Sequence, residues 1–471
     1  MTRPVVVAGG SVAGLACALA LGRRGFPVTV LEQAPPPPEG PAQRAADRWH
    51  RPTVAQHGHS HVLTSLGVRV LREHAPDVLD AALGAGARLL DLTDAAPDRL
   101  DDDELVALAV RRPVLELVLR QAVRSLPGVT LGHRVTVRGL STAGRRVTGA
   151  VTGDGAHLPA HAVVDATGRR GAWRAWLAAA GLPVPAELTA PTRVRGFTRF
   201  YRQTSPGPLP GPLNRGNAAG GIWGHYAAVA HPADNGTYAL TLGVPTRDPA
   251  TTGLRHPSAF TRVARLSPYV AAWADPAAGE PTGPVRPITL PPDILRPQTD
   301  AQAGPVAGLY PVGDSLCVTN PLFGRGMSLA LHHAFLLADL LDGGTGPAAE
   351  RAERAAALAD RVYRPWYEHA VREDAARTAL WRAQATGGPL PATPSPDGRP
   401  ALAAVAAAAA ADTVVWRGLT RVLMGLDTAE DVFDDEVFRK RVRSAPAPAA
   451  RGPLPPTRAE LVRAVSGEEP V

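Results

Sequence analysis

The chain has 471 residues, a formal net charge of +7 and a sequence pI near 10.0. Its 45% hydrophobic and 20% charged residues are typical of a globular protein, and its two cysteines exclude a disulfide-rich scaffold. The arginines that supply the positive charge are scattered and often close to acids, as in the segment 351–354, so the charge does not indicate a nucleic-acid partner.

No segment of the sequence has the features of a membrane span or a signal peptide. The alanine-rich stretch Ala401–Ala411 is too short and too weakly apolar to cross a bilayer. The N-terminus leads directly into a predicted strand, without a charged region, a long apolar region and a cleavage site. We therefore expect a cytoplasmic protein without a membrane span.

The N-terminal segment has the pattern of a nucleotide-binding βαβ unit. Val5–Ala8 is a predicted buried strand, Leu15–Leu21 a helix, and Val28–Leu31 a second, parallel strand that leads into Glu32. The turn after the first strand is Gly9-Gly10-Ser11-Val12-Ala13-Gly14. Such a turn brings backbone N–H groups and a helix N-terminus against a pyrophosphate, and the acid accepts hydrogen bonds from a ribose. The pattern predicts a dinucleotide site, with Ser11 in place of the middle glycine; a tight turn without a ligand is the alternative.

Residues 48–63 form a polar, histidine-rich segment that we predict to be a loop entering a helix. It contains Gln56-His57-Gly58-His59-Ser60-His61. Histidines at alternate positions would share one face of a strand, which is compatible with a metal site. No carboxylate or thiolate ligand is close in sequence, so we predict no metal here. Each histidine, taken singly, could equally be a hydrogen-bonded structural residue.

Strands and helices then alternate before the pattern changes near residue 190. The predicted elements are a helix at Val110–Leu126, strands of a meander at Val129–Val137 and Val147–Thr152, and a buried strand at Ala162–Asp165 that continues into Thr167-Gly168-Arg169. Between about 190 and 290, antiparallel strands are predicted at Arg195–Arg202, Gly221–Ala230 and Tyr238–Val244. We therefore expect a sheet domain inserted into the nucleotide-binding domain.

The nucleotide-binding pattern returns at Leu309–Val312. This predicted strand is followed by Gly313-Asp314, by the turn Asn320-Pro321-Leu322-Phe323-Gly324-Arg325-Gly326-Met327, and by a helix at Met327–Leu341. Residues 348–443 are predicted to be mostly helical with a break at Pro389–Pro400, and the proline-rich tail from Ala445 to be loosely ordered. The fold class is therefore α/β, a Rossmann-type domain with an inserted antiparallel sheet and a helical C-terminal extension.

These motifs together resemble the flavoprotein monooxygenases related to p-hydroxybenzoate hydroxylase, a superfamily that includes flavin epoxidases and flavin-dependent halogenases. The resemblance covers roughly residues 4–345 and rests on the segments 9–14, 165–169 and 313–327. It implies an FAD-binding domain in two parts, 1–185 and 296–345, and a substrate-binding sheet domain at 186–295. Residues 346–471 would form a helical C-terminal region with a flexible tail.

The resemblance implies roles for individual residues around FAD. Asp314 would bind the ribityl chain, Pro321 would lie near the isoalloxazine, and Gly324–Met327 would direct backbone N–H groups at the flavin pyrimidine, which is negative when reduced. The helix containing Arg112 resembles one that supplies an arginine to the flavin diphosphate; an ordinary exposed arginine is the alternative. The histidine segment resembles the Gln-x-x-His-x-His loop of bacterial polyketide flavin epoxidases and related actinobacterial oxidoreductases, with His57 as an addition.

The predicted cofactor-binding residues are Gly9, Ser11, Val12, Ala13, Gly14, Glu32, Gln56, Arg112, Asp165, Gly168, Gly313, Asp314, Pro321, Gly324, Gly326 and Met327. The candidates near the reacting part of the flavin are His59, His61 and Pro321. The candidates for the substrate pocket are Phe197, Phe200, Trp223, His225, Tyr226 and Tyr238. Aromatic residues on a sheet face also form cores, which is the alternative for the last group.

The implied activity is that of an FAD-dependent monooxygenase. Reduced FAD would react with O2 to give a flavin hydroperoxide that transfers one oxygen atom to a small-molecule substrate, by epoxidation or hydroxylation, in specialised metabolism. The histidine loop favours epoxidation by analogy alone. NAD(P)H would supply the electrons directly or through a separate flavin reductase, because the segment after Asp165 lacks the fuller Asp-Gly pattern that helps to bind a nicotinamide.

Three alternatives remain open from the sequence. An FAD-dependent reductase or dehydrogenase of an isoprenoid or other lipophilic substrate would use the same flavin motifs. A typical halogenase is disfavoured, because the only lysine is Lys440 and Trp223 has no second tryptophan two residues on. A non-enzymatic flavin-binding sensor is disfavoured by the large inserted sheet and the helical extension.

Overall fold

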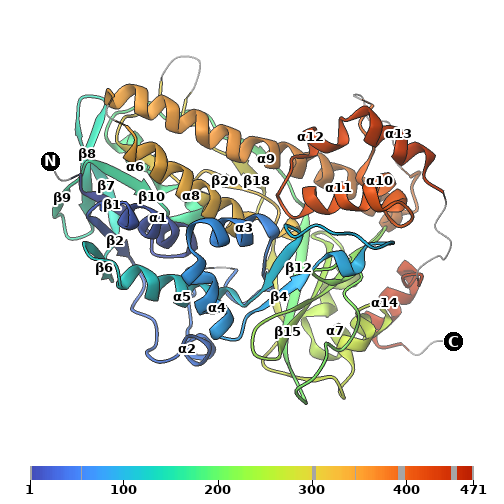
Figure 1. The fold of residues 1–471 in the computed structure, drawn as a ribbon. Coiled ribbons are helices and arrows are strands. Elements are labelled where there is room, and N and C mark those ends of the chain that lie inside the picture. Colours follow the sequence, from blue (N-terminus) through green and yellow to red (C-terminus); the bar gives the residue numbers. More distant parts are fainter. Residues whose placement is uncertain are drawn as a thin grey trace.

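The computed structural model describes residues 3–54, 56–299, 304–344, 346–390, 398–446 and 453–468. One end of the molecule, on the left in Figure 1, is built on a five-stranded parallel sheet with the strand order β19-β10-β1-β2-β6. Its strands are β1 (Val5–Ala8), β2 (Val28–Glu32), β6 (Val129–His133), β10 (Ala162–Asp165) and β19 (Leu309–Pro311). β1, β10 and β19 are buried along their whole length, as expected for parallel strands covered on both faces.

The two faces of this sheet are covered by different elements. Val5 and Val7 point into a core formed with helices α1, α5 and α8, whereas Val6 and Ala8 point into a second core formed with helix α6 and a small antiparallel sheet. The helices are α1 (Val12–Arg23), α5 (Arg112–Arg124), α6 (Ala172–Ala179) and α8 (Gly326–Asp342). The small sheet consists of β7 (Val137–Ala143), β8 (Arg146–Thr152) and β9 (His157–Pro159). This arrangement places the N-termini of α1 and α8 at the carboxyl edge of the parallel sheet.

Two elements of this part differ from the sequence-based expectation. The predicted strand Val129–Val137 is two strands, because β6 joins the parallel sheet beside β2 whereas β7 pairs with β8 in the small sheet. Arg134, with a φ of 59°, turns the chain between them. The predicted helix Val110–Leu126 begins only at Arg112, where Pro113 occupies its first turn, after strand β5 (Val106–Ala109).

A second sheet lies between the two parts of the Rossmann-type domain. Its strand order is β13-β14-β15-β12-β16, and β17 also pairs with β12. The strands are β12 (Val194–Gln203), β13 (Ala219–Ile222), β14 (Ala227–Pro232), β15 (Thr237–Pro245), β16 (Gly279–Pro281) and β17 (Arg286–Thr289). The predicted strand Gly221–Ala230 is two strands, because a turn at residues 223–226 folds β14 back onto β13. One face of the sheet packs on helix α7 (Pro257–Leu266) to form a separate hydrophobic core.

Helices form most of the described C-terminal region. The longest is α9 (Ala348–Thr386), which runs along the upper edge of the molecule in Figure 1. It is followed by α10 (Leu402–Ala409), α11 (Thr413–Leu423), α12 (Ala429–Phe433) and α13 (Glu436–Ser444). Most of the predicted break at Pro389–Pro400 lies outside the described residues. The predicted fold class, a Rossmann-type domain with an inserted antiparallel sheet and a helical extension, is confirmed.

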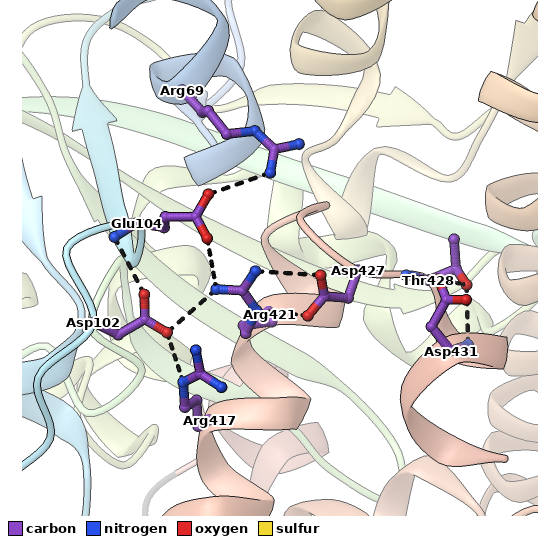
Figure 2. A network of polar contacts seen from close by, with 8 residues as sticks. All are labelled: Arg69, Asp102, Glu104, Arg417, Arg421, Asp427, Thr428 and Asp431. Atoms are coloured by element: carbon purple, nitrogen blue, oxygen red, sulfur yellow. Dashed lines mark hydrogen bonds and ion pairs between the residues drawn. The ribbon is translucent and has the colours of Figure 1, made fainter. Parts of the chain in front are cut away.

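An ionic network attaches the short C-terminal helices to the first part of the chain. Figure 2 shows Arg421 on α11 between Asp102, Glu104 and Asp427. Its guanidinium donates to Glu104 Oε2 at 3.0 Å and to Asp427 Oδ2 at 2.5 Å, and Arg417 donates to Asp102 at 2.7 Å. These three acids raise the pKa of Arg421, chiefly through its hydrogen bonds to Asp427. The helices are therefore joined to the segment before β5 by charge as well as by apolar packing.

The tail was expected to be loosely ordered, and for residues 458–466 this expectation is wrong. They form helix α14 (Arg458–Ser466), which is closed at its N-terminus by a capping box between Thr457 and Glu460. Leu461 and Val465 are buried against the α7 side of the inserted sheet. Arg458 pairs with Asp248 at 2.7 Å. Within the described residues, no helix has both the length and the hydropathy of a membrane-spanning helix.

Candidate functional site

The turn between β1 and α1 is tightly packed and leaves its backbone N–H groups at a helix N-terminus. A Cβ at Gly14 would lie 1.9 Å from the carbonyl oxygen of Gly9, so only glycine permits the helix to approach the turn this closely. Gly10 N donates to Glu32 Oε2 at 3.0 Å. Ser11, the residue before α1, does not cap the helix with its side chain. The first-turn N–H groups of α1, at Val12 and Ala13, therefore have no side-chain cap from Ser11.

The hydroxyl of Ser11 connects this turn to helix α5. It donates to Glu116 Oε2 at 3.0 Å and accepts a hydrogen bond from Arg112 Nη2 at 3.0 Å. Arg112 Nη1 donates to Gln56 Oε1 at 3.4 Å. Burial lowers the pKa of Arg112 to about 10, and the charge of Asp314 opposes that shift. The predicted residues Ser11, Gln56 and Arg112 thus lie together at the carboxyl edge of the sheet.

Three further charged residues complete this cluster, and the sequence analysis missed them. Arg51 bridges Glu32, at 2.8 Å, and the fully buried Glu116. Arg120 donates to the carbonyl oxygen of Gly10 at 2.6 Å, and burial lowers its pKa to about 10. The available signal was a pair of opposite charges, Glu116 and Arg120, one turn apart beside the apolar stripe of a predicted helix. Both oxygens of Glu32 are already hydrogen-bonded, one to Ala34 N at 2.8 Å and the other to Gly10 N and Arg51.

The predicted residue Asp165 holds the end of β10 rather than facing open space. It is fully buried and accepts hydrogen bonds from Thr167 N at 2.7 Å, Trp173 N at 2.8 Å and Ser315 Oγ at 3.2 Å. Burial raises its pKa, and these donors partly oppose the shift. Because Ser315 follows Asp314 directly, Asp165 fixes the Gly313–Asp314 motif against the turn that contains Gly168.

Asp314 is the acceptor that faces the cluster of arginines. Gly313 has a φ of +59°, and its N–H donates to the hydroxyl of Tyr363 at 3.0 Å, which sets the direction of the following residue. Burial raises the pKa of Asp314, while Arg112 and Arg169 lower it. Its carboxylate accepts no hydrogen bond from the described residues.

The turn from Asn320 to Met327 lies beside Asp314. Asn320 Oδ1 accepts from Leu322 N at 2.9 Å and caps a short 3₁₀ helix that begins at Pro321. Gly324 has a φ of +67° and helix α8 begins at Gly326, so the N–H groups of Gly326 and Met327 lie at a helix N-terminus. A Cβ at Gly324 would meet no atom within 4 Å, and one at Gly326 would come within 3.9 Å only of Asp314 Oδ1. No other described residue therefore covers the backbone at Gly324 and Gly326 on the side where a Cβ would point, and Asp314 comes nearest to it there.

The histidine segment joins the Rossmann-type domain to the inserted sheet. His59 Nδ1 lies 3.0 Å from Thr198 Oγ1, and Thr198 Oγ1 lies 3.0 Å from Thr241 Oγ1. His61 Nδ1 donates to the carbonyl oxygen of His59 at 2.8 Å. Burial lowers the pKa of His59 to about 4 and that of His61 to about 3, so both rings are neutral at pH 7. His57 is bound instead to the carbonyl oxygen of Trp49 at 2.7 Å. Among the residues that the structure describes, no group of three or more metal-ligating side chains is positioned to hold a metal ion.

The contact between His59 and Thr198 identifies which face of the inserted sheet is turned toward the histidines. Side chains alternate along a strand, so Phe200 shares this face, and the register adds Thr241 and His231 from the neighbouring strands. Burial lowers the pKa of His231 to about 4.

Most of the six predicted pocket residues lie elsewhere. Phe197, Tyr226 and Tyr238 belong to the core on the α7 side, because they have the opposite strand parity or orientation. Trp223 packs on Tyr226, with 4.9 Å between the ring centroids, and His225 is close to Arg458 of the C-terminal tail. Only Phe200 of the six lies on the face that contacts the histidine segment.

The donors and acceptors of this site fit an FAD molecule. Arg112 Nε is buried without a hydrogen-bond partner among the described residues. No hydrogen bond from another described residue ends on the carboxylate of Asp314. A buried cation beside two helix N-termini suits a diphosphate, and a free carboxylate suits ribityl hydroxyls. The open surface beside Gly324 and Gly326 suits a flat ring system.

The fold is similar to that of solved structures described as FAD- or flavin-dependent enzymes, as the sequence predicted. PqsL, described as a probable FAD-dependent monooxygenase from Pseudomonas aeruginosa, aligns over 82% of this chain and 99% of its own, with a TM-score of 0.58 and 18% identity. The flavin-dependent brominase Bmp2 aligns over 94% of this chain and 98% of its own, with a TM-score of 0.56 and 15% identity. In sequence, the chain is 28% identical over 355 residues to Protein Rv3254 of Mycobacterium tuberculosis, a match that covers 69% of this chain and 70% of that protein. No protein-family model matches the chain.

Proposed function

We propose that the chain is an FAD-dependent monooxygenase that transfers one oxygen atom from O2 to a small organic substrate, by epoxidation or hydroxylation, in specialised metabolism. The observation that carries the proposal is the meeting of three sequence-distant segments, represented by Ser11, Arg112 and Asp314, beside a polar face of the inserted sheet. Ligands of parallel α/β sheets bind at the carboxyl ends of the strands, where these segments meet. The fold shared with solved FAD-dependent enzymes supports it.

Each segment would hold one part of the cofactor. Ser11, Arg112 and the N-terminus of α1 would bind the diphosphate, Glu32 the adenosine ribose, and Asp314 the ribityl chain. The N–H groups at the start of α8 would face the flavin pyrimidine and stabilise the negative charge of its reduced form. NAD(P)H would reduce the bound FAD, directly or through a separate flavin reductase. The reduced FAD would then provide the chemistry that activates O2.

The substrate would lie between the flavin site and the sheet face formed by Thr198, Phe200, Thr241 and His231. The neutral rings of His59 and His61 would offer hydrogen bonds without adding charge, and the hydroxyls of Thr198 and Thr241 would orient a polar group of the substrate. This closed, hydrogen-bonded wall would also keep bulk water from the reacting atoms. We place the reaction in the cytoplasm, where NAD(P)H is available.

The first experiment is made on the purified protein. Flavin released by denaturation is identified by chromatography, the bound flavin is photoreduced without oxygen, and the reduced protein is mixed with O2 in a stopped-flow spectrometer. We expect FAD, and a transient spectrum that belongs neither to oxidised nor to reduced flavin. NADH and NADPH are then added with and without a flavin reductase to identify the electron donor.

Two results would contradict the proposal. Direct reoxidation without a transient species, together with no substrate-dependent oxygen uptake, would favour a reductase or dehydrogenase that uses the same flavin motifs. A protein that binds no FAD on reconstitution would remove the basis of the proposal altogether.

A further inference from the structure

Through one row of polar side chains, helix α9 contacts the two turns that contain Gly313 and Asn320, and also the inserted sheet and the segment that leads into it. Tyr363 accepts the hydrogen bond from Gly313 N at 3.0 Å, and Asp374 accepts two bonds from Asn320 Nδ2 at 2.8 Å each. Arg377 donates to the carbonyl oxygen of Thr192 at 2.9 Å, and Trp381 Nε1 donates to that of Trp223 at 2.7 Å. The first two contacts hold the flavin-site turns, and the last two hold the inserted sheet.

At the centre of this row, Asp374 faces a second carboxyl group, that of Asp293. Asp293 begins β18 (Asp293–Leu295), which lies between β11 (Leu188–Ala190) and β20 (Cys317–Val318) in a three-stranded sheet below α9 (Figure 1). Asp293 is 0% exposed and Asp374 1% exposed. Neither oxygen of Asp293 has a hydrogen-bond donor among the described residues. Asp293, which accepts no hydrogen bond, and the adjacent Asp374 cannot both be ionised at such a place, so a proton between them is the missing donor.

Two buried arginines and a further carboxyl group lie around the pair. The arginines are Arg325 and Arg377, and the carboxyl group is that of Glu373, which lies beside the exposed Arg372. Arg325 is 1% exposed, lies 4.5 Å from the ring centre of Phe323, and has no hydrogen-bond partner among the described residues.

We propose that Asp293 is a neutral carboxylic acid that donates its proton to Asp374, and that this shared proton positions the Asn320–Gly326 turn for FAD. Asp293 is a positioning residue, because it acts through Asp374 and Asn320. The same proton stabilises the junction with the inserted sheet. Thr192, which accepts the bond from Arg377, donates through its hydroxyl to the carbonyl oxygen of Pro291 at 2.9 Å, two residues before Asp293.

The groups that face Asp293 come from several elements. From α9 they are Asp374, Arg377 and Tyr367, with Glu373 beside Asp374; from β20, Cys317; and from the turn after Asn320, Arg325. β11 contributes no ionisable residue between Leu188 and Ala190. His369 on α9 remains neutral, because burial lowers its pKa to about 2. The burial of Asp293, and next the charge of Asp374, raise the pKa of Asp293 to about 8.

This pKa fixes the direction of the pH dependence. The unfolded chain releases the proton near pH 3.8, whereas the folded chain keeps it until about pH 8. Between these values the folded state binds more protons, so this group lowers the folding equilibrium constant up to tenfold for each unit that the pH rises. Above about pH 8 this contribution is constant. The turn, however, then faces two ionised carboxylates, and FAD affinity falls.

The test compares the wild type with Asp293→Asn, whose amide donates permanently to Asp374. Urea unfolding of the apoprotein is measured from pH 5 to 9. We expect the ratio of the folding equilibrium constants of Asn variant and wild type to rise several-fold per pH unit up to about pH 8. Asp339→Asn, an exposed residue of α8 that pairs with Arg24, is the control and should follow the wild type. Parallel curves for Asp293→Asn and wild type would overturn the proposal.

FAD binding provides a second readout, which alone depends on the proposed flavin function. The dissociation constant of the wild type should rise at least tenfold between pH 8 and 9.5, whereas that of Asp293→Asn should remain constant. If the variant does not fold, infrared difference spectra of the wild type between pH 7 and 9.5 decide: the loss of a protonated carboxylic acid band supports the proposal, and its absence overturns it. A protein that shows the unfolding result but binds no FAD would refute the proposed function and leave the shared proton standing.

Discussion

The charges around Ser11 explain how two buried glutamates can lie beside the proposed diphosphate site. Glu32 and Glu116 contribute two negative charges, and the three arginines that contact them or the turn contribute three positive ones. The cluster therefore keeps one net positive charge in the absence of a ligand. Because burial lowers the pKa of Arg112 and of Arg120 to about 10, their charged forms are poorly solvated, and an incoming anion would compensate them.

At the same scale, Asp314→Ala should weaken FAD binding without weakening the apoprotein. The free carboxylate would accept hydrogen bonds from ribityl hydroxyls, and the loss of charge-assisted bonds of about 1.5–3 kcal/mol corresponds to an affinity about 10- to 100-fold lower. Burial raises the pKa of Asp314, so its removal relieves a desolvation cost in the apoprotein. Fluorescence titration with FAD measures the affinity. Asp342→Ala, at the other end of α8, is the control; equal affinities for the two variants would exclude Asp314 from the site.

Residues whose role depends on local backbone were predictable, and residues whose role depends on packing were not. Gly9, Gly14 and Gly313 could be placed because a turn that meets a helix N-terminus needs them within one short segment. Arg51 and Glu116 meet only after α5 has packed beside α1, so their pairing leaves no trace in either segment alone. The sequence could not separate pocket from core among the aromatic residues of the inserted sheet for a related reason. Both faces of this sheet are apolar in part, and strand parity does not say which face covers α7.

At the scale of elements, α9 connects the C-terminal extension to the flavin-site motif, and Tyr363→Phe tests that connection. The substitution leaves the N–H of Gly313 buried without its acceptor, which should lower the free energy of unfolding by about 1–3 kcal/mol. Urea unfolding should show a lower midpoint with an unchanged slope. Tyr367→Phe, one turn further along α9, is the matched control, because its hydroxyl makes no hydrogen bond within the described residues. Equal midpoints for both variants would show that the contact contributes nothing.

For α9, the sequence predicted the helix but not the burial of its polar side chains. Apolar and polar periodicity was sufficient to predict a helical region after residue 348, but not that its polar residues Asp374 and Arg377 are buried. The single strand predicted at Val129–Val137 is wrong, because a run rich in valine and threonine carries no sign that the chain leaves one sheet for another at Arg134. The short strands β11, β18 and β20 were not predicted, because two or three residues give no periodicity.

For the whole molecule, the last described helix closes the apolar side of the inserted sheet, and Leu461→Ala tests this closure. Leu461 is buried against the core of α7, and the capping box at Thr457 forms α14 independently of that contact. Loss of the side chain should cost about 2–5 kcal/mol of docking free energy. Because α14 is the last described helix, we expect local opening that exposes Arg458 and Arg463 to trypsin, while the protein otherwise remains folded. Limited proteolysis with mass analysis measures the rate of cleavage there. Leu454→Ala, on the same segment but 80% exposed, should be cleaved at the wild-type rate. An unchanged rate in Leu461→Ala would show that the tail is held mainly by the ion pair between Arg458 and Asp248.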